Sequence, residues 1–183
     1  METALFIPLK PAATETKKEE VIRIQGLYKS FGTNHVLIDF NLQLFAGENV
    51  VVLGKSGSGK SVLIKCIIGL LQPDQGLVEV FGKNIPDLSH EELDKIRMKV
   101  GFLFQSNALY DSMTVKENLE FPLRRHSIRM VQHEVDDLVL NALDDVGLAH
   151  TINLMPAELS GGMRKRIALA RTLILRPDII LYD

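Results

Sequence analysis

The residues with the clearest chemical potential form one glycine-rich segment. It consists of Gly54, Lys55, Ser56, Gly57, Ser58, Gly59, Lys60 and Ser61, and it matches the pattern G-x-x-x-x-G-K-[ST] at every fixed position. Glycines let a backbone approach phosphate oxygens closely and adopt positive φ angles. Lys60 could place its ammonium between the β- and γ-phosphates of a nucleotide, and the Ser61 hydroxyl could ligate Mg²⁺. The segment therefore predicts a phosphate-binding loop, with Val62 beginning the helix that follows.

The residues on each side of this loop have the pattern of the elements that must hold it. Residues 50–53 are a continuous apolar run, which predicts a parallel strand buried on both faces. Residues 62–68 are apolar on almost every side, which predicts a buried helix. The amino end of that helix would add its dipole to the phosphate site. Strand, loop and helix in this order favour nucleotide binding over a chance match.

Composition narrows the class of protein. The chain has 183 residues, of which 46% are hydrophobic, enough for one large domain with a real core. The net charge of −2 gives no indication of a nucleic-acid-binding surface. Cys66 lies in an apolar stretch and is expected to be a small buried hydrophobe, and the histidines show no metal-ligand spacing. No apolar run approaches the ~20 residues of a membrane span, and residues 1–20 are expected to form a flexible tail without a secretory signal pattern.

The sequence of the first part of the chain predicts a small antiparallel layer of strands. Short strands are expected at residues 21–24, 36–38 and 40–44, and a hairpin is expected at residues 78–83. Ser89 and Glu92 have the spacing of a capping box, so a helix should begin there. Another apolar strand is expected at residues 100–104.

The character of the sequence changes after Gln105. Apolar residues recur at helical spacing between Val131 and Val146, and Gly147 follows as a C′ residue. We therefore expect a helical section over about residues 106–158, with no strand in it.

The last part returns to the core. A helix is expected from Ser160 to about Leu175, where Pro177 closes it, and residues 179–182 are expected to form a final buried strand. The predicted layout is a strand core, a helical insertion and a return to the core.

A second glycine-containing motif begins that helix. It consists of Leu159, Ser160, Gly161, Gly162 and Met163. Ser160 is a good N-cap, and the two glycines would expose backbone N–H groups. The following basic residues, 164–166, would oppose the helix dipole unless an anion docks there. The alternative is a glycine-rich turn with solvated basic residues.

The two motifs together give the chain a resemblance to the ATP-binding cassette (ABC) family, from about residue 21 to the end. The family signature is L-S-G-G-Q, about a hundred residues after the phosphate loop; here Met163 replaces the glutamine. Gln105 matches the Q-loop glutamine, Phe31 matches the aromatic residue that stacks on adenine, and Asp183 matches the Walker B aspartate. The resemblance implies an α/β P-loop NTPase cassette with a RecA-like core, an antiparallel β layer and a helical subdomain.

A narrower resemblance is to the ATPase subunit of Mla-type phospholipid transporters. It rests on residues 104–110, 113–115, 121–124 and 154–158, and on a signature that ends in Met163. The alternative is the ATPase of another importer, for amino acids or phosphonates. A GTPase would need an N-K-x-D motif, which the sequence lacks, and a non-enzymatic nucleotide-binding module is a further alternative.

The resemblance implies the chemistry and the partners of the site. Two copies would form a head-to-tail dimer, with each ATP between the phosphate loop of one copy and residues 159–163 of the other. Ser61, Gln105 and Asp183 would hold Mg²⁺, and Lys60 would contact the γ-phosphate. An integral membrane permease and an MCE-domain lipid-binding protein would be partners, without nucleic acid. The location would be peripheral, on the cytoplasmic face of the bacterial inner membrane.

The chain ends at Asp183, and in the ABC family the next residue is normally the glutamate that polarises the attacking water. The D-loop and the switch histidine also come later. We therefore expect this chain to be C-terminally truncated. Lys60, Ser61 and Asp183 would hold MgATP weakly and without steady-state turnover, and an uncovered sheet edge would make the chain poorly soluble.

Overall fold

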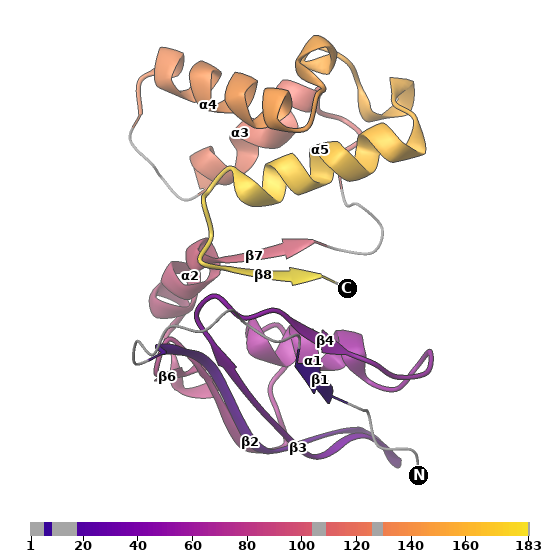
Figure 1. Cartoon of the computed structure of the whole chain (residues 1–183), viewed down its shortest axis with the longest axis vertical. Coiled ribbons are helices and arrows are strands. Elements are labelled where there is room, and N and C mark those ends of the chain that lie inside the picture. Colours follow the sequence, from indigo (N-terminus) through magenta and orange to yellow (C-terminus); the bar gives the residue numbers. More distant parts are fainter. Residues whose placement is uncertain (1–5, 9–17, 104–108, 126–129, 183) are drawn as a thin grey trace. The chain divides into compact units, whose positions relative to one another are not determined.

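The computed structural model describes residues 6–8, 18–103, 109–125 and 130–182, in two compact units, Met1–Ile96 and Arg97–Asp183. The strands are β1 (Phe6–Pro8), β2 (Glu20–Phe31), β3 (Asn34–Phe45), β4 (Val50–Val52), β5 (Gln75–Val80), β6 (Lys83–Asn84), β7 (Val100–Leu103) and β8 (Ile179–Tyr182). The α-helices are α1 (Lys60–Ile67), α2 (His90–Lys99), α3 (Val115–Arg125), α4 (Gln132–Asp145) and α5 (Gly161–Leu173). Short 3-10 helices lie at Ile85–Asp87, Ala149–Thr151 and Pro156–Glu158. The α-helices and every strand except β5 are labelled in Figure 1.

The first unit contains the predicted antiparallel layer, with strand order β3-β2-β5-β6. Its β2–β3 hairpin is longer than the sequence predicted, because the strands expected at residues 36–38 and 40–44 are one strand. Asp39, between them, has a φ of 48°, and Gly26 on the facing strand has a φ of 54°. The Gly26 N–H donates a hydrogen bond to Asn41 Oδ1 at 2.9 Å. The chain therefore bulges at this point, where the sequence pattern suggested a break.

The strand before the glycine-rich loop differs from its prediction. Residues 50–53 were expected to be a parallel strand buried on both faces, but β4 pairs antiparallel with β1. The side chains of Val51 and Leu53 are 45% and 46% exposed. An apolar run shows that a segment favours a strand, but it does not specify the partner, and among the described strands β1 is the one that pairs with β4. The expected tail of residues 1–20 thus contains a strand, β1, and the first residue of β2.

Helix α1 packs its buried face in the first unit. Leu63, Cys66 and Ile67 are buried, as expected for the apolar helix after the loop. Burial raises the pKa of the Cys66 thiol. Cys66 therefore stays a protonated, apolar core group, in agreement with the sequence prediction.

In the second unit, the parallel pair of β7 and β8 accompanies helices α3, α4 and α5 (Figure 1). Strands β7 and β8 are parallel, in a register that places Val100 opposite Ile179. Ile179 is buried, but Tyr182 is 59% exposed, so the final strand is as predicted while its burial is confined to its start. Gly101 allows close packing, because a Cβ there would lie 2.8 Å from Thr172 Cγ2 and 2.9 Å from Pro177 Cγ. The end of α5 and the turn after it therefore fit against β7.

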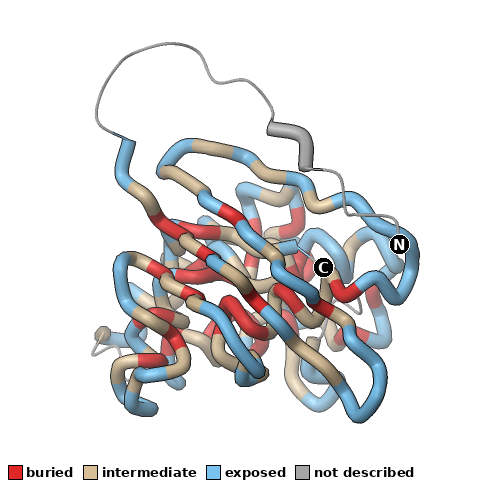
Figure 2. The backbone as a smooth tube through the Cα atoms, turned by 90° about the horizontal axis from the view of Figure 1, so that it is seen from below, coloured by how far each residue is buried: buried red, intermediate tan, exposed pale blue. Residues whose placement is uncertain are grey.

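Helices α3, α4 and α5 share an apolar core, which includes the fully buried Leu119, Leu143 and Ile167. Buried residues are red in Figure 2. The described part of residues 106–158 contains no strand, as predicted. Gly147 lies beyond the end of α4 with a φ of 67°, which confirms it as the C′ residue. None of the described helices is long and apolar enough to cross a membrane.

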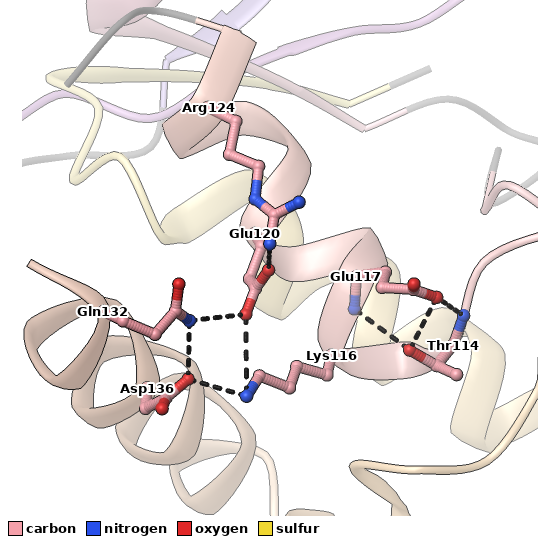
Figure 3. Close-up of polar contacts among 7 residues, drawn as sticks. All are labelled: Thr114, Lys116, Glu117, Glu120, Arg124, Gln132 and Asp136. Carbon is pink, nitrogen blue, oxygen red and sulfur yellow. Dashed lines mark hydrogen bonds and ion pairs between the residues drawn. The ribbon is translucent and has the colours of Figure 1, made fainter. Parts of the chain in front are cut away.

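A polar network joins α3 to α4 beside this core (Figure 3). Glu120 is 2% exposed and forms ion pairs with Arg124 and Lys116. Lys116 Nζ lies 2.7 Å from Asp136 Oδ1, and Gln132 Nε2 donates hydrogen bonds to Asp136 and Glu120 at 3.0 and 3.3 Å. The contact with Asp136 raises the pKa of Lys116, and the pKa of Asp136 is lowered in turn. The buried carboxylate is thus compensated by cations from its own helix and an amide from its neighbour.

Asn118 fixes the loop before α3. Its side chain is fully buried and accepts a hydrogen bond from the Tyr110 N–H at 2.8 Å. Its amide group donates to the carbonyls of Tyr110, Met113 and Thr114 at 3.0–3.1 Å. One buried side chain therefore bonds four backbone groups of this loop, two of which, the Tyr110 and Thr114 carbonyls, also accept backbone hydrogen bonds.

Capping boxes at the amino ends of α2 and α3 should make the stability of the protein depend on pH, with lower stability at acid pH. Ser89 and Thr114 donate backbone hydrogen bonds to Glu92 and Glu117, at 3.1 and 2.7 Å, in capping boxes. These bonds lower the pKa of both carboxyls from the ordinary value of 4.5. Their contribution is complete above pH 4.5 and is lost as the pH falls through the lowered values, because the folded state binds these protons less readily than the unfolded state.

We expect the urea midpoint, measured by circular dichroism, to fall between about pH 5 and about pH 3, and to fall less in Glu117→Gln. The Gln side chain cannot ionise there. Equal slopes in the native protein and the variant would contradict this role for Glu117.

Candidate nucleotide site

The glycine-rich loop needs its glycines for steric reasons. A Cβ on Gly54 would lie 2.4 Å from Ser58 Oγ, and a Cβ on Gly59 would lie 2.8 Å from Val36 Cγ1. Gly57 and Gly59 also have positive φ angles, 80° and 94°. The loop is therefore wound tightly against β3 in a conformation that residues with a Cβ rarely adopt.

Lys60 lies at the centre of this loop. Its ammonium donates hydrogen bonds to the carbonyls of Gly54 and Lys55, each at 2.8 Å, and to Ser58 Oγ at 3.4 Å. Lys60 begins α1, and the N-cap residue Gly59 has no side chain to cap the first turn. The positive charge and the helix N-terminus thus act at the same place, where an anion is favoured.

The other residues predicted around the phosphate loop lie where α1 begins. Ser61 and Val62 are half-buried in the first turn, whereas Lys55, Ser56, Gly57 and Ser58 are exposed. The hydroxyl of Ser61 belongs to the class of oxygen ligand that Mg²⁺ accepts. The loop, Lys60 and Ser61 are therefore brought together as the motif predicts.

Phe31 lies at the end of β2, on the same hairpin that packs against the loop. Its side chain is 48% exposed. Val36, the third residue of the return strand β3, lies against Gly59. The structure thus places Phe31 on a hairpin whose next strand contacts the phosphate loop.

The second motif begins α5 as expected. Ser160 is the N-cap, and its Oγ accepts a hydrogen bond from the Met163 N–H at 3.3 Å. Leu159 is buried, whereas Gly161 and Gly162 are exposed. The half-buried side chain of Met163 packs against the core of the helical group. The glycine backbone is therefore presented to solvent, and the methionine is part of the internal packing.

The basic residues after this motif behave differently from one another. Arg166 donates a hydrogen bond from Nη1 to the Val146 carbonyl at 2.8 Å, at the end of α4. Helix α4 has no basic residue in its last turn, so this contact supplies a cation at its C-terminus. The side chains of Arg164 and Lys165 are exposed, and no residue described in the structure pairs with them. The contact of Arg166 was missed by sequence reasoning, because its partner is 20 positions away.

Some predicted site residues are not tested by this geometry. Gln105 and Asp183 lie outside the described residues. Phe31 and the phosphate loop belong to the first unit, and residues 159–163 belong to the second. Sequence reasoning also missed two contacts beside Phe31: Lys29 lies over the Phe31 ring, and Asp74 accepts hydrogen bonds from Lys29 and the Ser30 N–H.

Comparison with known proteins agrees with the two motifs. A model of the ABC transporter family matches residues 37–183. A probable ribonucleotide transport ATP-binding protein of Mycobacterium leprae, mkl, is 46% identical over 162 residues, which is 88% of this chain and 46% of that protein. The intermembrane phospholipid transport system ATP-binding protein MlaF of Haemophilus influenzae is 39% identical over 165 residues, 90% of this chain and 62% of that protein. The chain thus spans about half the length of the first relative and under two thirds of the second.

A solved structure shows the same fold. MJ0796, described as a bacterial ABC transporter cassette in a dimeric structure, superposes with a TM-score of 0.79 and 34% sequence identity. The match covers 88% of this chain and 73% of that chain. The α/β cassette with an antiparallel layer and a helical group, predicted from the sequence, is confirmed.

Proposed function

The chain belongs to the ABC transporter family, and from that premise we propose that it is the MgATP-binding part of the ATPase subunit of a phospholipid transporter, which hydrolyses MgATP in its full-length form. The observation that carries the ATP-binding part is the phosphate loop, in which Lys60 lies between the Gly54 and Lys55 carbonyls at the start of α1. An ammonium at a helix N-terminus favours a polyphosphate.

Each residue of the proposed site has one role. Lys60 neutralises charge on the β- and γ-phosphates, and Ser61, Gln105 and Asp183 supply a hydroxyl, an amide and a carboxylate oxygen, which is a donor set that suits Mg²⁺. The metal, when bound, would neutralise charge on the phosphates during transfer. Phe31 stacks on the base, which its 48% exposure allows.

The proposed active form is a head-to-tail dimer, as the sequence resemblance implies. Exposed Gly161 and Gly162 at the amino end of α5 support this arrangement, because they leave backbone N–H groups accessible to a phosphate from a second copy. The dimeric structure of the related cassette MJ0796 also supports it.

The phospholipid cargo is the finer part of the proposal. It is supported by the similarity to MlaF and by the loop segments that resemble Mla-type ATPases. The relative mkl is named as a probable ribonucleotide transport protein. A transport assay therefore has to compare phospholipid with ribonucleotide as the transported molecule. The proposed partners are a membrane permease and an MCE-domain lipid-binding protein, and the proposed location is the cytoplasmic face of the inner membrane.

We expect the full-length protein, with the residues that the family carries after Asp183 and purified together with its permease, to move labelled phospholipid in vesicles when ATP is added. Labelled ribonucleotide and labelled amino acid should not move, and Lys60→Ala should abolish the movement. ATP-dependent movement of either water-soluble cargo, with none of phospholipid, would overturn the lipid assignment and leave the ATPase assignment standing.

A further inference from the structure

We propose that Lys29 and Asp74 hold the Phe31 ring as a stacking platform for the nucleotide base, which makes them positioning residues of the nucleotide site. This inference rests on the proposed function, because it assumes that a base binds at Phe31. All the residues concerned lie in the first unit.

Asp74 holds the end of β2 at two atoms. Its Oδ1 accepts from Lys29 Nζ at 2.7 Å, and its Oδ2 accepts from the Ser30 N–H at 2.6 Å. The Asp74 N–H also donates to the Tyr28 carbonyl at 2.9 Å. Asp74 therefore binds the three residues that precede Phe31, through both its side chain and its backbone.

Lys29 joins this anchor to the ring. Its ammonium lies 5.5 Å from the centre of the Phe31 ring, over the ring face. Lys29 and Phe31 are two positions apart in β2, so their side chains leave the strand on the same side. Lys29 is only 15% exposed, whereas Phe31 is 48% exposed. The ammonium of Lys29 is thus largely shielded from solvent, whereas about half of the Phe31 side chain remains accessible.

This geometry suits base stacking for an electrostatic reason. An aromatic ring attracts a cation to its face, within about 6 Å of the centroid. The cation occupies one face of Phe31 and draws electron density toward it, so the opposite face makes a better contact with the electron-rich face of a purine. Asp74 Oδ1 keeps the ammonium in place while Oδ2 holds the Ser30 N–H, and this limits the positions that the ring can adopt.

A structural alternative is that Lys29 and Asp74 form an ordinary surface ion pair. Such pairs contribute little to stability, and an ordinary ion pair would leave binding of the base unchanged. The chain offers a matched control, because Lys18 Nζ pairs with Glu48 Oε1 at 2.6 Å elsewhere in the same unit. The two explanations predict different results when the ion pair is removed. A positioning role predicts weaker binding of the base with unchanged binding of the phosphates, whereas an ordinary ion pair predicts no change in either.

The test compares ATP with inorganic tripolyphosphate, which has no base, by calorimetric titration of the protein. Lys29→Met and Asp74→Ala should weaken ATP binding by about two- to tenfold and leave tripolyphosphate binding unchanged. Lys29→Arg should retain ATP affinity, because a guanidinium also binds over an aromatic ring. Lys18→Met should change neither affinity.

The outcomes separate the inference from the function on which it rests. Phe31→Ala should selectively weaken ATP; if it does and Lys29→Met resembles Lys18→Met, the inference is wrong. Equal losses for ATP and tripolyphosphate in Lys29→Met would also overturn it, since they would show a disturbed phosphate loop. Unchanged ATP affinity in Phe31→Ala would overturn the stacking role of Phe31 itself, and with it the inference. If Lys60→Ala leaves binding of both ligands unchanged, the proposed nucleotide site is wrong.

Discussion

Replacement of Lys60 by alanine is expected to weaken MgATP binding at least about tenfold, because a charge-assisted bond to a phosphate contributes roughly 1.5–3 kcal/mol. The substitution also removes the bonds to the Gly54 and Lys55 carbonyls, which lie at 2.8 Å from the ammonium. The loss should therefore include both the phosphate contact and the order of the loop. Calorimetric titration with ATP and ADP measures it, and unchanged affinity for ATP would exclude the assigned role.

Two variants separate the parts of this effect. Lys60→Arg retains the charge but not the compact ammonium, so it should bind ATP better than Lys60→Ala and worse than the native protein. Lys55→Ala removes a neighbouring exposed cation while the loop carbonyl at that position remains. It should lose much less affinity than Lys60→Ala. Similar losses in the two alanine variants would indicate that general charge, and not the position of Lys60, attracts the nucleotide.

Replacement of Gly161 by aspartate is expected to abolish ATP-dependent dimerisation and leave ATP binding to each copy unchanged. A Cβ at Gly161 would meet no atom within 4 Å, so the isolated chain has room for the new side chain. Gly161 is the first residue of α5. A carboxylate at this position interacts favourably with the helix dipole and stabilises the helix by about 0.3–1 kcal/mol. The variant should fold normally, but its charge would repel a γ-phosphate arriving from a second copy.

Light scattering with a non-hydrolysable ATP analogue measures this effect. We expect the dimer dissociation constant to rise at least about tenfold, so that the aspartate variant stays monomeric at concentrations at which the native protein dimerises. Gly161→Ala is the matched control, because it adds the Cβ without the charge and should weaken the dimer less. Normal dimerisation of the aspartate variant would show that residues 159–163 do not contact the nucleotide of a second copy.

The features predicted correctly from the sequence are local ones. The capping box of Ser89 and Glu92, the N-cap Ser160, the C′ residue Gly147 and the tight glycine-rich loop before α1 each depend on residues a few positions apart. Hydrogen bonds over such distances form in almost any tertiary context, because the loop entropy that they cost is small. The residue types therefore determine these structures nearly by themselves.

The features decided by the tertiary structure join residues that are distant in the sequence. Lys29 meets Asp74 across 45 positions, Arg166 meets Val146 across 20, and β7 pairs with β8 across the whole helical group. The partner of β4 and the continuity of β3 through Asp39 also escaped the sequence pattern. Charge and apolar character show that such groups need partners, but several partners could satisfy each need. Simultaneous packing of the whole unit selects among them, so the sequence by itself determined the glycine-rich loop before α1, and the fold determined the partners of residues such as Lys29 and Arg166.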